Sequence, residues 1–345
     1  MKRLHYIDTL KIVAIFMVVF QHNDLNSAIR FYFQSFSVLL FFVASGFVSS
    51  PKSHLPFMDV LKKYIRHLMA PYFLISIVLY LFWFFVGRYY GNKAILKSDP
   101  LDNFIGVFYA QGGSEYMQWG IPMWFLPTLF VVVMLDYFVS KLRLPFQILA
   151  TLVFPVIGMG AFQVLGYHLP WSIDIALVVY LFYFTGRIFK RIDLAEAIKG
   201  WELPIFTLCF AVHLYTSQLN EIVGVHNGQY GKFLVLMYFN AILAFIWLFA
   251  LLKVVPSWKP LTWLGCNTLP ILAFHLLAMT MIKGVALFVF QHEVIFTPIN
   301  AAFYAVLQIF LLVPVILFLN KYLPFFVGQA QKKEPVSDSL SATSW

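Results

Sequence analysis

Ten long hydrophobic segments limit what this chain can fold into. Each is close to the roughly 20 residues that a helix needs to cross the hydrocarbon core of a bilayer. With 61% hydrophobic and 11% charged residues, the chain cannot hide these segments inside a soluble domain, where about 25% of residues are charged. This excludes a conventional cytosolic enzyme, a disordered chain and a small disulfide-rich secreted protein, and predicts an all-α, polytopic integral membrane protein. The segments are residues 9–29, 31–50, 68–90, 121–140, 146–166, 171–189, 202–219, 233–254, 263–290 and 297–324.

Two of these segments are irregular. The first is the least hydrophobic, because its apolar run covers only residues 12–20 and polar residues follow from Gln21 onward. The ninth is long, and we expect it to tilt or break near Lys283 and Gly284. The N-terminus has no small-residue cleavage site, so we do not predict a cleavable signal peptide.

The positions of the cations predict the orientation of the chain. If the N-terminus is cytoplasmic, 18 of the 24 Lys and Arg residues fall on the cytoplasmic side of ten spans. This excess matches the positive-inside rule and predicts that both termini are cytoplasmic. It also explains the net charge of +9 without a nucleic-acid partner. We expect one transmembrane domain over residues 1–329 and a polar, disordered cytoplasmic tail over residues 330–345.

Ionisable side chains are expensive inside a bilayer, so each is a candidate for function. The first span holds four, namely Asp8, Lys11, His22 and Asp24. Lys11 and His22 are separated by about 1100° of helical rotation, close to three full turns, and by about 16 Å of rise. One face of this helix is therefore predicted to present a cation at the cytoplasmic end and an imidazole deeper in the membrane.

This pairing suits group transfer to a hydroxyl. An imidazole is the usual general base for a hydroxyl nucleophile, and a cation near the cytoplasm can hold a phosphorylated donor such as a coenzyme A ester. The structural alternatives are a packed histidine at His22 and a lysine at Lys11 that reaches the interface and sets topology.

A second group of cations precedes the third span, in a predicted loop over residues 51–71. Lys63 and Arg66 lie three residues apart and share a face if this stretch is helical. We interpret them as a binding site for the phosphates of the donor, and plain positive-inside charge is the alternative.

The remaining polar groups favour structural interpretations. His213 and His275 lie within spans, and Asp136 is within reach of Lys141 or Arg143 at the end of the fourth span. Cys209 and Cys266 have no metal-ligand spacing, the sequence has no zinc signature, and no metal is predicted.

The loop over residues 91–120 is predicted to face the outside. Glu115 and Trp119 in this loop are candidates for contact with an acceptor, although no pattern supports that role. Asp174 is explained as a helix N-terminal carboxylate.

Several short motifs occur in a fixed order along the chain. The first span contains Lys11 followed after ten residues by His22; the others read FFVASGF at residues 41–47, RHLMAPYF at 66–73, WFL at 124–126 and GCNTLPI at 265–271, the last ending at His275. Together they resemble the acyltransferase-3 family of integral membrane acyltransferases, and within it the branch that includes fucose 4-O-acetylase-like proteins. Lys63 departs from the pattern, because many members have arginine there and lysine cannot make bidentate phosphate contacts.

The resemblance implies transfer of an acetyl group from cytoplasmic acetyl-CoA to a hydroxyl of a cell-envelope glycan or its lipid-linked precursor, in the bacterial plasma (inner) membrane. It implies that His22 is the catalytic base or the carrier of the acyl group. We place catalysis at His22 and Asp24, and donor binding at Lys11, Lys63 and Arg66. The predicted partners are acetyl-CoA, a carbohydrate acceptor and the lipid bilayer.

Two other classes of protein remain open on the sequence alone. A transporter or flippase for a glycan or lipid would also have about ten spans with buried charges, although we find no two related halves with broken helices. A non-catalytic membrane subunit would leave the Lys11–His22 face without a role.

Overall fold

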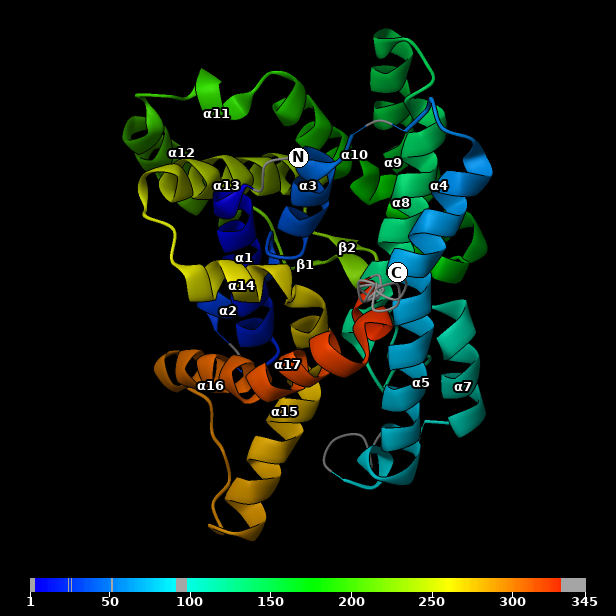
Figure 1. Ribbon diagram of the computed structural model, residues 1–345, viewed down its shortest axis with the longest axis vertical. Coiled ribbons are helices and arrows are strands. Elements are labelled where there is room, and N and C mark those ends of the chain that lie inside the picture. Colours follow the sequence, from blue (N-terminus) through cyan, green and yellow to red (C-terminus); the bar gives the residue numbers. More distant parts are fainter. Residues whose placement is uncertain (1–3, 24, 26, 51, 91–97, 330–345) are drawn as a thin grey trace, which may run out of the picture.

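The computed structural model describes residues 4–23, 25, 27–50, 52–90 and 98–329, and it is built almost entirely of helices. The predicted all-α membrane fold is confirmed (Figure 1). The α-helices are α1 (His5–Gln21), α2 (Ala28–Gln34), α3 (Leu39–Val48), α4 (Phe57–Tyr64), α5 (Ala70–Phe85), α7 (Pro100–Tyr109), α8 (Phe125–Val139), α9 (Leu144–Leu165), α10 (Ile173–Arg191), α11 (Leu194–Ala197), α12 (Glu202–Ser217), α13 (Leu234–Val254), α14 (Lys259–Cys266), α15 (Thr268–Phe288), α16 (Pro298–Leu311) and α17 (Val313–Tyr322).

Short elements connect these helices. They are the π-helix η1 (Ile65–Met69), the 3₁₀ helices η2 (Gly87–Tyr89), η3 (Ile121–Trp124), η4 (Pro170–Ser172), η5 (Val225–Asn227) and η6 (Pro324–Val327), and the strands β1 (Val223–Gly224) and β2 (Gln229–Tyr230). The two strands pair antiparallel, with Val223 opposite Tyr230. In the view of Figure 1 this hairpin lies near the middle of the molecule.

Among the described residues, eight helical stretches are long and apolar enough to cross a membrane, and they coincide with eight of the ten predicted spans. They are Ala28–Val48, Phe57–Phe85, Ile121–Val139, Leu144–Leu165, Pro170–Arg191, Leu234–Val254, Thr268–Phe288 and Pro298–Tyr322.

The other two predicted spans form shorter helices. The first corresponds to α1, with 17 residues, and the seventh to α12, with 16 residues. At 1.5 Å per residue these helices are about 24–26 Å long, slightly less than the hydrocarbon core of about 30 Å.

The stretch from Phe57 to Phe85 differs from the prediction of a loop up to residue 71. α4, η1 and α5 form one helical stretch of 29 residues, so Lys63 and Arg66 lie on a helix. A helix of this length is about 44 Å long, which is enough to cross the hydrocarbon core and the headgroup regions together. The first turns of this helix can therefore extend beyond the hydrocarbon core. Lys63 and Arg66 lie in these turns and are exposed.

The ninth predicted span breaks at a different place from the one expected. α15 runs without interruption through Lys283 and Gly284, and the break lies at Asn267, between α14 and α15. The Asn267 side chain donates to the carbonyl of Trp263 at 2.7 Å and accepts a hydrogen bond from Asn320 at 2.7 Å. These bonds satisfy the polar groups that a helix break exposes.

Close helix crossings hold the core together. A Cβ atom on Gly46 of α3 would lie 1.9 Å from the carbonyl oxygen of Tyr183, and one on Gly186 of α10 would lie 2.0 Å from that of Val43. α3 and α10 thus pack backbone against backbone, as membrane helices do where small residues face each other. A Cβ atom on Gly265 of α14 would lie 1.8 Å from the carbonyl oxygen of Asp8, which fixes the start of α1 in the same way.

Asp136 has a different partner from the predicted Lys141 or Arg143. Its carboxylate accepts a hydrogen bond from the Arg187 guanidinium of α10 and another from the Tyr180 hydroxyl at 3.1 Å. Asp136 and Arg187 are almost fully buried, so this ion pair links α8 to α10 inside the protein.

Candidate functional site

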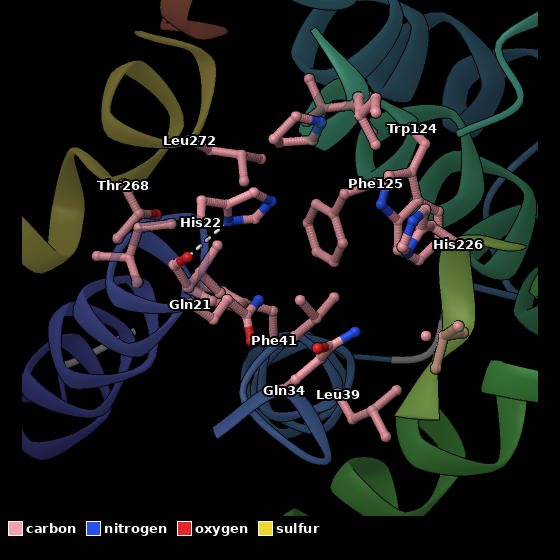
Figure 2. Close-up of a pocket in the computed structure, with 18 of the residues that line it drawn as sticks. Gln21, His22, Gln34, Leu39, Phe41, Trp124, Phe125, His226, Thr268 and Leu272 are labelled. Carbon is pink, nitrogen blue, oxygen red and sulfur yellow. Dashed lines mark hydrogen bonds between the residues drawn. The ribbon is translucent and has the colours of Figure 1, made fainter. Parts of the chain in front are cut away.

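His22 lines a cavity of about 330 Å³ among α1, α2, α3, η3, the β1–β2 hairpin and α15. Most of the lining is aliphatic or aromatic, including Phe41, Trp124 and Phe125. Figure 2 shows the His22 ring on one side of this space, Phe125 beside it, and His226 with Trp124 on the far side. Its volume and apolar walls are typical of a site for a small organic ligand. We refer to it as the His22 cavity.

The position of His22 follows from the end of α1. The helix ends at Gln21, and His22 is its C-cap residue, with near-helical backbone angles. The His22 Nδ1 lies 2.6 Å from the carbonyl oxygen of Val18. A carbonyl oxygen only accepts, so Nδ1 carries the proton and Nε2 is the basic nitrogen of the neutral ring. This is the tautomer that a general base or a nucleophile needs.

His275 lies directly against His22. The two ring centroids are 4.9 Å apart, with an interplanar angle of 69°. The Nδ1 of His275 donates to the carbonyls of Ile271 and Leu272 at 3.0 and 2.9 Å, and the side chain is fully buried. His275 therefore packs edge to face against the imidazole of His22 and limits its movement.

His226 faces the same cavity from the opposite side, and no sequence pattern pointed to it. It lies in η5, within the β1–β2 hairpin, and its ring centroid is 6.4 Å from that of Trp124. The pKa of His226 is lowered to about 4, mainly by burial and to a smaller extent by the nearby His22 and His168. The ring is therefore neutral at pH 7.

The backbone around His226 is held by the preceding loop. Gln111 donates from Nε2 to the carbonyl of His226 at 3.2 Å. A Cβ atom on Gly112 would lie 3.0 Å from both the Cβ of His226 and the Cγ of Trp124, so glycine lets this loop approach closely. In the sequence this region shows only a histidine between two hydrophobic segments, and no spacing relates it to His22.

Arg30 was also missed, because the sequence places it among the charges outside the predicted spans. It lies on α2 and lines the His22 cavity, and its Nη1 donates to the carbonyl of Leu25 at 3.3 Å. Among the described residues that line this cavity, it is the one with a permanent positive charge.

The structure does not bring the predicted donor-binding residues to the His22 cavity. Lys11 lies 3.5 Å from the Asp8 carboxylate, with 26% of its side chain exposed. Lys63 and Arg66 are exposed on the α4–η1 helix. None of the three is among the described residues that line the cavity. Asp24, the second predicted catalytic residue, lies outside the described residues.

Two other predictions concern the outer loop and metals. Trp119 is buried and donates from Nε1 to the carbonyl of Asn103 at 3.1 Å, so it supports the loop, whereas Glu115 is exposed. Within the described part of the chain, no group of three or more His, Cys, Asp or Glu side chains is arranged to hold a metal ion.

Comparison with known proteins identifies the family. Searches of curated proteins and of solved structures found no match. A family model described as an acyltransferase domain, that of the acyltransferase-3 family, matches residues 4–325, almost the whole chain. This match, together with the long apolar helices, makes the chain a multi-pass membrane protein of the acyltransferase-3 family.

Proposed function

We propose that this protein is a membrane O-acetyltransferase. In this proposal it moves an acetyl group from cytoplasmic acetyl-CoA to a hydroxyl of a cell-envelope glycan, or of its lipid-linked precursor, in the bacterial plasma membrane. The observation that carries the proposal is His22: its tautomer is set by the Val18 carbonyl, and its ring faces a mostly apolar cavity. The family match supports acyl transfer over the transporter alternative.

His22 supplies the base in the proposed reaction. Its Nε2 takes the proton of the acceptor hydroxyl while the hydroxyl oxygen forms a bond to the carbonyl carbon of the thioester. The carbon–sulfur bond then breaks, and coenzyme A leaves as the thiol after taking the proton back from His22. We assign Arg30 to stabilise the negative charge that develops on the carbonyl oxygen. The attraction between a guanidinium and a negative charge is stronger in an apolar cavity than in water.

The same nitrogen also permits a two-step route, in which Nε2 first takes the acetyl group and then passes it to the hydroxyl. Recovery of an acetylated peptide containing His22 after a brief reaction with acetyl-CoA would select this route. Both routes depend on the Nε2 of His22.

The remaining predicted residues keep their proposed roles. Asp24 is the carboxylate partner of the catalytic pair, on sequence grounds. Lys11, Lys63 and Arg66 bind the phosphates of coenzyme A at the cytoplasmic surface. Since these three residues lie away from the His22 cavity, the elongated donor would extend from the surface cations to the cavity, with its thioester at His22.

The first test is His22→Ala. We expect glycan acetylation to fall by about 100-fold or more, because general-base catalysis contributes about 10²–10⁴ in rate. Mass spectrometry of the envelope glycans of cells that produce each variant measures this loss, and immunoblotting of membranes verifies insertion. His292→Ala, a change at an exposed histidine, is the matched control and should retain full acetylation. Normal acetylation by a membrane-inserted His22→Ala variant would disprove the assignment.

A further inference from the structure

A second cavity lies next to the His22 cavity. It has a volume of about 630 Å³ and is lined by residues 109 and 111–116, by the C-terminal end of α9 with the residues that follow it, and by η5. Ile121 and His226 line both cavities, so these two side chains form a shared wall. We refer to the second cavity as the outer cavity, because the sequence predicts its loops outside the cytoplasm.

The lining of the outer cavity differs chemically from that of the His22 cavity. Three tyrosines line it, Tyr109, Tyr116 and Tyr167, and polar side chains such as Glu115 and Asn227 accompany them. The described residues of this lining include neither Lys nor Arg. A tyrosine offers an apolar ring face and a polar hydroxyl, and a carboxylate accepts hydrogen bonds from hydroxyl groups. The walls therefore match a neutral, polyhydroxylated ring better than a phosphate or another anion.

Hydrogen bonds and ring contacts hold these walls in place. Tyr109 donates its hydroxyl to the carbonyl of His168 at 2.5 Å, and its ring lies 5.2 Å from that of Tyr116 at an angle of 30°. His168 stacks on Phe162 at 4.2 Å, and its Nδ1 lies 2.6 Å from the carboxylate of Asp174. A preformed cavity loses less conformational entropy when its ligand binds.

We propose that the outer cavity binds a neutral sugar ring of the acceptor, on Tyr116 and Glu115, and directs one of its hydroxyls past His226 toward His22. This inference rests on the proposed function and adds the site and chemical class of the acceptor. The donor thioester would lie on one side of the shared wall and the sugar on the other. His226 is then a positioning residue for the hydroxyl that reacts.

A blocking experiment tests this proposal without knowledge of the acceptor glycan. Ser114 is exposed and lines the outer cavity, so Ser114→Cys provides a thiol for a bulky, membrane-impermeant methanethiosulfonate reagent. We expect labelling of intact cells to lower acetylation of their own envelope glycan at least 10-fold. The KM for acetyl-CoA, measured in membranes from the labelled cells, should not change.

Two controls accompany the blocking experiment. Glu293→Cys places a thiol at an exposed site away from the cavity, and its labelling should not alter acetylation. Labelling of the wild-type protein controls for its native Cys209 and Cys266. Equal acetylation by labelled and unlabelled Ser114→Cys would overturn the acceptor site. If the unlabelled wild-type protein acetylates no glycan, the proposed function fails first, and this inference fails with it.

A substitution provides an independent readout. Tyr116→Ala removes a ring face and should lower glycan acetylation about 10-fold without a change in the KM for acetyl-CoA, and Tyr116→Phe should restore most of the loss. Tyr90→Ala, at an exposed tyrosine outside the cavity, is the matched control. Full acetylation by Tyr116→Ala, or an equal loss in Tyr90→Ala, would count against the proposal.

Discussion

Asp136 and His22 are both polar side chains in an apolar region, yet their surroundings are opposite. The carboxylate of Asp136 is enclosed by Arg187 and Tyr180, in a part of the core where α3 and α10 pack backbone against backbone. His22 also has a hydrogen bond, to the carbonyl of Val18, but its ring faces a cavity of about 330 Å³.

The difference distinguishes two roles of buried polar side chains. Around Asp136 the polar groups neutralise one another, which is typical of a structural link. Around His22 one nitrogen is used to orient the ring, and the cavity leaves space for reactants beside it. A polar residue in a membrane protein is thus a functional candidate mainly where it borders open space.

The Asp136 region gives the largest expected effect on stability. Asp136→Ala leaves the Arg187 charge buried without its carboxylate, which typically costs about 3–5 kcal/mol. We expect a marked drop in the apparent melting temperature in detergent and a lower yield of folded protein. Asp59→Ala, which removes an exposed carboxylate of α4, is the control and should have little effect.

A double substitution sharpens this comparison. Asp136→Leu combined with Arg187→Met removes both charges, and we expect it to recover most of the stability lost by Asp136→Ala. If the double variant were as unstable as the single one, the pair would contribute more than charge neutralisation.

The crossing of α3 and α10 gives a smaller effect. Gly46→Ala places a Cβ atom against the carbonyl of Tyr183, and overpacking of this kind costs about 1–3 kcal/mol. Gly160→Ala in α9 is the control: apart from the adjoining backbone of its own helix, nothing lies within 4 Å of the added Cβ, so it should be neutral or slightly stabilising. Measured melting temperatures that fall equally for the two variants would contradict the close crossing.

The smallest effect concerns acid sensitivity at His226. Its pKa is about 4 in the folded protein, below the ordinary value of 6.5, so the unfolded chain binds more protons between these values. Stability should therefore decrease as the pH falls from 6.5 to 4. His226→Gln cannot take up this proton and should lose about 1–2 kcal/mol less over that range, which melting curves at pH 7.5 and pH 4.5 can measure. An equal loss of stability in the two proteins would mean that His226 is already charged in the folded state.

The sequence predicted those parts of the molecule that depend on local patterns. Hydrophobic length locates eight helical stretches, and the cost of an ionisable group in lipid singles out His22. Both properties belong to short stretches of chain and do not depend on how the helices pack.

Pairings between distant residues could not be predicted in this way. Asp136 pairs with Arg187, 51 residues away, and not with Lys141 or Arg143, which are nearer in the sequence. Helix packing determines which cation reaches the carboxylate. Arg30 and His226 line the His22 cavity because of the way α2 and the hairpin pack in the folded protein. Neither residue has a spacing in the sequence that relates it to His22. The break at Asn267 likewise depends on a hydrogen bond from Asn320.

The contacts of α1 have a consequence for how the protein is made. Asp8 packs on Gly265, and Asn23 forms hydrogen bonds with the carbonyl of Ala301 and with Gln308. The first helix of the chain therefore packs against some of the last helices. At about 5–20 residues per second, a ribosome needs roughly ten seconds to a minute to synthesise the intervening chain. During that interval a short helix with several ionisable groups must wait in the bilayer, or at its edge, without these partners. Slow completion of the chain should therefore prolong the time during which α1 lacks these partners and is open to degradation.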